Sequence, residues 1–231
     1  MTPLYFYILL GSLVVPAVFS VFYLDFIKKW RNFVSSTLII AILFLIWDAI
    51  FTENRVWGFE ESYCLGVYIL GMPIEEWLFF LIIPFCSLFS HFALFYKFPD
   101  LKIKRITTIV LTILFFLISV CIAVINFEKA YTFVNFIFLS IFLSLGGLFG
   151  IRILQQFYIS FLIILIPFFI VNGLLTGIAT ENPIVWYNNQ ENLGIRLATI
   201  PIEDIGYAFS MLFGNLLLFE KLNKRENEYF V

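Results

Sequence analysis

Two short motifs place adjacent acidic residues at the start of long apolar segments. Pro73-Ile74-Glu75-Glu76 precedes one such segment, and Pro201-Ile202-Glu203-Asp204 precedes another. Neighbouring carboxyl groups in an apolar setting can donate, receive or relay protons, because burial and mutual repulsion keep at least one of them uncharged. The two motifs therefore indicate acid–base chemistry in a water-poor environment.

The same spacing relates other parts of the chain. The motifs lie 128 residues apart (201 − 73), and at that offset Thr52-Glu53-Asn54 matches Thr180-Glu181-Asn182. Leu65-Gly66-Val67 likewise matches Leu193-Gly194-Ile195. Matches at one offset without a net gap predict a tandem duplication, in which each copy carries one acidic pair.

The composition predicts an all-α integral membrane protein. Of the 231 residues, 62% are hydrophobic and 13% are charged, whereas soluble domains rarely exceed about 50% apolar residues. A spanning helix needs roughly 20 apolar residues, and seven segments qualify: 3–23, 34–51, 74–96, 106–125, 131–150, 157–178 and 201–219. Segments 63–72 and 191–200 are apolar but too short to span, so we expect re-entrant or interfacial pieces. The net charge of −2 and the lack of a basic run indicate no nucleic-acid partner.

The seven segments divide into two similar halves and a linker. Residues 1–97 hold the first three helices, 98–128 hold a linker with the fourth, and 129–231 hold the last three with a short charged tail. This parallel 3+1+3 repeat implies a pseudo-twofold axis along the membrane normal. Of the 14 lysines and arginines, only Arg55, Lys129 and Arg196 fall outside if the N-terminus is outside. The positive-inside rule therefore predicts an outer N-terminus and a cytoplasmic C-terminus in the cell membrane.

The acids have two interpretations. Proline followed by acids is typical of a helix start, where the carboxylates meet the positive end of the helix dipole. Ionisable groups at membrane depth, however, usually mark a functional site. Glu75 is equivalent to Glu203, and Glu76 to Asp204. Because adjacent helical residues point about 100° apart, the two acids of one motif cannot share one role.

Asp48 breaks the symmetry of the two halves. Its counterpart at the 128-residue offset is Thr176, so Asp48 either tunes or pairs with the repeated acids or is a helix-end carboxylate that reaches the interface. A second polar set is repeated in the loops and is either supporting or simply solvated and helix-capping: Glu53, Asn54, Glu181 and Asn182.

Aromatic residues make up 20% of the chain. The aromatic belt of membrane proteins explains many of them, while rings near the acids can stabilise a cation. The candidates for substrate contact are Trp47, Trp57, Trp77, Phe79, Phe80, Trp186, Tyr187 and Tyr207. No cluster at metal-ligand spacing and no GxGxxG motif is present, so the sequence indicates neither a metal nor a nucleotide cofactor.

Three stretches carry a resemblance to a known family. Pro73-Ile-Glu-Glu-Trp-Leu-Phe-Phe, Trp186-Tyr187-Asn188-Asn189 and Pro201-Ile-Glu-Asp-Ile-Gly-Tyr resemble the membrane-integral lycopene cyclases, in their fused form. The resemblance implies an intramolecular lyase or isomerase that closes the ends of lycopene into β-rings, through γ-carotene to β-carotene, without net redox change. It implies a carotenoid substrate, the lipid bilayer and other carotenoid-pathway enzymes as partners. Asn188 joins the supporting polar residues.

Under this resemblance, our hypothesis is that Glu75 or Glu203 donates the proton and Glu76 or Asp204 receives or relays it. Which acid of each pair is the donor stays open. The alternative function is a small transporter, because parallel repeats of this plan also build sugar carriers in which midplane acids relay protons. A membrane prenyltransferase is disfavoured, since no DxxD or DxxxD cluster is present to hold magnesium and diphosphate.

Overall fold

The structure is a computed structural model that describes the backbone of residues 2–22 and 30–229 and the side chains of 2–21 and 30–223. These residues form seven helices long and apolar enough to cross a membrane, which confirms the all-α membrane class. They are α1 (Leu4–Phe22), α2 (Trp30–Glu53), α3 (Ile74–Lys97), α4 (Arg105–Ile125), α5 (Ala130–Phe149), α6 (Ile151–Leu175) and α7 (Glu203–Tyr229). Lys28 and Lys29, which contribute to the predicted charge bias, lie outside the described residues.

Three helices extend several residues beyond the apolar pattern. α2 begins at Trp30 rather than at 34. α6 begins at Ile151 rather than at 157, and α7 continues to Tyr229 rather than ending at 219. The polar first turns of α6 are stabilised by the loop between α3 and α4, because the Gln155 side chain donates to the Ile103 carbonyl at 2.7 Å and the Ile103 N–H donates to the Gln155 carbonyl at 3.0 Å. A hydropathy pattern does not predict such helix turns, because their residues are polar and contacts with a loop stabilise them.

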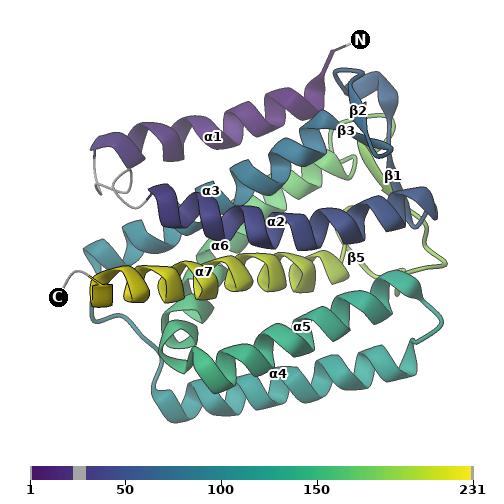
Figure 1. The fold of residues 1–231 in the computed structure, drawn as a ribbon. Helices are drawn as coiled ribbons and strands as arrows, with labels where there is room; N and C mark the ends of the chain where they lie inside the picture. The colour runs from purple at the N-terminus through teal and green to yellow at the C-terminus, as the bar shows by residue number, and fades with distance from the viewer. Residues whose placement is uncertain (1, 23–29, 230–231) are drawn as a thin grey trace.

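α7 is the central helix of the bundle. It packs against α2, α3, α5 and α6, while α4 lies outside against α5 and α1 lies outside against α3 (Figure 1). Burial agrees with this arrangement, since 67% of the apolar window of α7 is buried, compared with 22% in α1 and in α4. The acids at the start of α7 are therefore set inside the bundle.

Short strands lie at the end of the bundle that carries the N-terminus (Figure 1). β2 (Tyr68–Ile69) pairs with β3 (Met72–Pro73), and β5 (Arg196–Leu197) pairs with β6 (Ile200–Pro201), so segments 63–72 and 191–200 contain hairpins rather than helical re-entrant pieces. β1 (Trp57–Phe59), which is followed by a 3₁₀ turn at Glu61–Tyr63, pairs with β4 (Val185–Tyr187).

The strands of the first half recur in the second half at the 128-residue offset. Strand bounds 57–59, 68–69 and 72–73 correspond in this way to 185–187, 196–197 and 200–201. Because β1 and β4 are counterparts and pair with each other antiparallel, with Gly58 opposite Trp186, they tie the two halves together at this end of the bundle.

An aromatic cluster fixes α2 against α5 and α7. The Trp47 ring lies 4.9 Å from the Tyr207 ring and 4.7 Å from the Phe138 ring, measured between centroids. Phe44, which is fully buried, packs edge-on against Tyr207 at 5.1 Å. Phe80 is also in this core at 1% exposure. The centre of the bundle is thus filled by rings on one side of α7.

Candidate active site

The first acid of each motif holds the hairpin that precedes its helix. Glu75 and Glu203 are fully buried. The Glu75 carboxylate accepts the Leu65 N–H at 2.6 Å, and the Glu203 carboxylate accepts the Leu193 N–H at 2.7 Å. The two donors are themselves counterparts at the 128-residue offset. The same contact therefore anchors the same loop in both halves.

Glu203 makes two contacts that Glu75 lacks, one through its carboxylate and one through its backbone carbonyl. The Thr132 hydroxyl of α5 donates to Glu203 Oε1 at 2.7 Å, and the Asn135 amide donates to the Glu203 backbone carbonyl at 2.8 Å. Among the described residues, the Oε2 atoms of both Glu75 and Glu203 have no hydrogen-bond donor. Each first acid is thus anchored through a single carboxyl oxygen.

The second acid of each motif turns into a cavity. Adjacent helical residues point about 100° apart, so Glu76 and Asp204 face away from the loops that Glu75 and Glu203 hold. Glu76 accepts the Tyr5 hydroxyl at 2.5 Å. Asp204 accepts the Tyr131 hydroxyl at 2.5 Å through Oδ1 and the Tyr187 hydroxyl at 3.0 Å through Oδ2.

Asp48 joins the same group of acids. It is 2% exposed, accepts the Trp57 indole N–H at 2.5 Å and the Thr52 hydroxyl at 3.4 Å, and lines the same cavity as Glu76, close enough to interact with it. Its counterpart in the other half, Thr176, lines the same cavity. The structure therefore brings Asp48, Glu76 and Asp204 to one place, whereas Glu75 and Glu203 do not line it.

The cavity has a volume of about 710 Å³, and its lining apart from the acids is mostly apolar. Four helices supply most of the lining. Representative apolar residues are Ile8 and Val15 of α1, Ile83 of α3, Ile164 and Val171 of α6, and Met211 of α7. Among the described residues, no lysine or arginine lines the cavity, so no side-chain cation neutralises the carboxyl groups there.

Aromatic rings surround the acids. The Tyr131 ring lies 5.1 Å from Trp57 and stacks on Tyr187 at 5.7 Å, and Tyr207 completes the group at 6.3 Å from Trp57. Burial, together with the charge of Asp204, raises the pKa of the Tyr187 phenol well above its ordinary value. Tyr187 therefore stays protonated at neutral pH and remains a hydrogen-bond donor to Asp204.

The aromatic residues predicted for substrate contact divide into three sets. Trp57, Phe79, Tyr187 and Tyr207 line the cavity, whereas Trp47 and Phe80 belong to the adjoining core. Two others do not line it. The Trp77 indole donates to the Ile69 carbonyl at 3.3 Å, and Trp186 packs over Gly58, where a Cβ would lie 2.3 Å from its ring.

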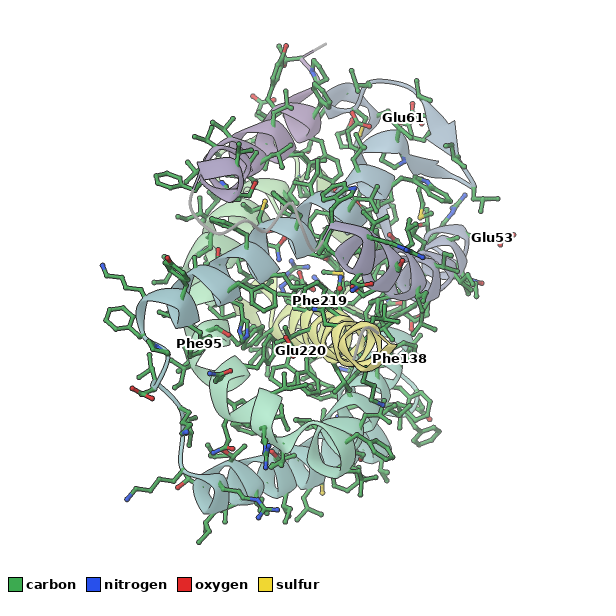
Figure 2. All side chains as sticks on the ribbon, turned by 60° about the vertical axis from the view of Figure 1, so that its left-hand side comes forward. Glu53, Glu61, Phe95, Phe138, Phe219 and Glu220 are labelled. Atoms are coloured by element: carbon green, nitrogen blue, oxygen red, sulfur yellow. The ribbon has the colours of Figure 1, made fainter. Side chains whose placement is uncertain are left out.

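The predicted supporting polar residues lie away from the cavity. Glu53 is exposed and projects away from the bundle (Figure 2). The Asn54 side chain donates to the Ile50 carbonyl at 2.7 Å near the end of α2, and Asn188 accepts the Gln190 N–H at 3.0 Å. Glu181 and Asn182 are exposed on the surface. The contacts of Asn54 and Asn188 are local contacts of loops and helix ends.

Two residues of the site, Tyr5 and Tyr131, were not predicted from the sequence. Tyr5 and Tyr131 each lie in the first turn of the first helix of their half and donate to the second acid of that half. They are separated by 126 residues rather than 128, so a comparison at one fixed offset does not align them. A tyrosine at the start of both first helices is the signal that points to them.

Comparison with known proteins identifies a family. A family model described as lycopene cyclase matches residues 2–94 and 128–222. These two segments cover well over half of the chain and contain both acidic motifs, Asp48, Tyr5 and Tyr131. A search of curated proteins and a search of solved structures each gave no match.

Proposed function

This chain belongs to the lycopene cyclase family, and we propose on that premise that it closes the ψ-ends of lycopene into β-rings, giving γ-carotene and then β-carotene. Membership makes it a multi-pass membrane enzyme of the carotenoid cyclase type, and nothing supports the transporter alternative. The observation that carries the finer proposal is the meeting of Asp48, Glu76 and Asp204 in one apolar, aromatic cavity.

The proposed reaction is an isomerisation that needs no oxidant or reductant. A proton adds to the terminal carbon–carbon double bond and leaves a tertiary carbocation. The neighbouring double bond attacks that cation, which forms the ring bond and moves the positive charge into the ring. Loss of a ring proton restores a double bond, so one proton enters and one leaves. The site must therefore supply an acid, a base and a surrounding that excludes water.

We assign the acid to the pair Asp48 and Glu76 and the base to Asp204. Two neighbouring carboxyl groups in an apolar site hold one proton between them, because both cannot carry charge. The hydrogen-bond donors to Asp48 and Glu76 reach one oxygen of each carboxyl group. Asp204 receives a phenol hydrogen bond on each oxygen, from Tyr131 and Tyr187, and hydrogen bonds to a carboxylate favour its charged form. This assignment replaces the donor role first expected for Glu75 or Glu203, because those acids hold loops.

The rings that line the cavity suit a cationic intermediate. The faces of Trp and Tyr attract a cation by about 2 kcal/mol each when water is excluded. Trp57, Tyr207 and Tyr131 lie next to the three carboxyl groups. In this proposal they stabilise the carbocation between the two proton transfers.

The proposal includes the placement of the chain in the cell membrane. The N-terminus and the hairpins lie outside, and the C-terminus lies in the cytoplasm, as the distribution of lysine and arginine favours. The two halves, 1–97 and 129–231, are duplicates joined by the linker 98–128. The matching strand bounds at the 128-residue offset support this division.

Expression in bacteria that accumulate lycopene tests the function. We expect the extracted pigment to shift from lycopene to γ-carotene and β-carotene, and a strain that carries the empty vector to keep lycopene. Glu53→Gln serves as a matched variant, since this carboxylate is exposed and does not line the cavity. Unchanged lycopene, with the protein present in the membrane, would contradict the proposed reaction and would favour the transporter.

A further inference from the structure

The cavity reaches the outer surface of the bundle on one side. Several of its lining residues are also largely exposed: Tyr7 at 57%, Val15 at 61% and Ile170 at 61%. Tyr7 and Val15 belong to α1, and Ile170 belongs to α6. Residues that line a cavity and are exposed at the same time mark its opening, so the cavity opens between α1 and α6.

Gly11 leaves space in this opening. It lines the cavity and is exposed, and a Cβ built on it would have no atom of another helix within 4 Å. α1 packs chiefly against α3 and touches α6 over only a short stretch. The two helices are therefore not closed against each other at this position.

The opening lies at the depth of the lipid tails. Gly11 is seven residues from the start of α1 at Leu4, which places it about 10 Å along the helix at a rise of about 1.5 Å per residue. Ile170 is five residues before the end of α6 at Leu175, or about 8 Å from that end. A molecule that passes between them comes from the bilayer rather than from water.

The corresponding space in the other half is filled. With Tyr5 aligned to Tyr131, the counterparts of Ser12 and Pro16 are Phe138 and Phe142. Both rings pack against Phe44 of α2, with centroid distances of 5.6 Å and 6.3 Å. Among the described residues, the first half therefore has an open path to the acids where the second half has a packed core.

We infer that a linear, apolar polyene dissolved in the bilayer enters sideways between α1 and α6, past Gly11, and brings one end against Asp48, Glu76 and Asp204. This inference rests on the proposed function and names the route to its site. It commits to an apolar chain as the occupant because the residues that line the path are mostly apolar and the path ends at the acids.

A graded series at Gly11 tests the entrance. The purified chain is placed in vesicles that contain lycopene, and both the polyene retained by the protein and the product formed are measured for Gly11→Ala, Gly11→Leu and Gly11→Trp. Both quantities should fall as the side chain grows. For Gly11→Trp, product should fall on the order of 10²-fold, since an end held away from the acids loses its reactive geometry.

Val14→Trp is the matched control, because Val14 is 58% exposed on the same helix and does not line the cavity. It should retain polyene and form product as the unmodified chain does. An active unmodified chain with an equally active Gly11→Trp variant would overturn the entrance alone. An unmodified chain that retains polyene without converting it would overturn the proposed reaction, and the retained polyene in the Gly11 series would still decide the route.

Discussion

Replacing Glu76 with glutamine is expected to lower product formation by about 10²–10⁴-fold, the range that general acid catalysis contributes. Glu76→Gln keeps an oxygen that can accept the Tyr5 hydroxyl but removes the carboxyl that shares a proton with Asp48. Asp48→Asn removes the other member of the pair and should have an effect of similar size. The measurement is product formed per amount of protein in the membrane, with lycopene as substrate.

In our proposal the two acids act as one pair, so the effects of replacing them should not add. The double variant Asp48→Asn/Glu76→Gln should form product about as slowly as the slower of the two single variants. Glu53→Gln should leave the rate unchanged. Full activity in both Asp48→Asn and Glu76→Gln, with normal amounts of protein, would remove this pair from the proton transfer.

Replacing Glu203 with leucine is expected to cause the largest loss of stability among the acids. Glu203→Leu leaves the Leu193 N–H and the Thr132 hydroxyl without their acceptor, at about 1–3 kcal/mol for each buried group. Glu75→Leu leaves only the Leu65 N–H without one and should cost less. In a chain of this size, the unfolding midpoint in detergent should fall by about 2–4 °C for each kcal/mol.

The conservative variants separate this structural role from a catalytic one. Glu75→Gln and Glu203→Gln keep the oxygen that accepts the loop N–H, so we expect both to fold and to retain most of their activity. If either Gln variant were stable but as inactive as Glu76→Gln, the first acid would be the proton donor, as the sequence-based hypothesis held.

Much of the fold can be predicted from the sequence because the bilayer imposes strong constraints. Apolar length alone identifies the seven helices, and the loop between α4 and α5 falls within a few residues of its predicted position. The starts of α2 and α6 were placed too late, since hydropathy does not record polar helix turns. The two short apolar segments were not predicted to form hairpins, because a strand of two residues is too short to show the alternating pattern of a β-strand.

The candidate site was only partly predictable. The repeated motifs identified the four acids, but which acid faces the cavity depends on helix rotation, and that is set by loop contacts such as the one from Leu65 to Glu75. Asp48 was marked by its lack of an acidic counterpart, yet its neighbour Glu76 lies on another helix. Tyr5 and Tyr131 were not predicted because they lie 126 residues apart, whereas the acidic motifs lie 128 residues apart.

The central claim is that an exchangeable carboxyl proton at this site starts ring closure and that a ring proton is lost afterwards. The most direct test is a single-turnover reaction in D₂O, with the protein in excess over lycopene and mass spectrometry of the product. The account predicts one deuterium atom for each ring closed, since the acid is exchanged before the substrate arrives. Rings formed without any deuterium would show that the hydrogen does not come from an exchangeable acid, and would contradict the account.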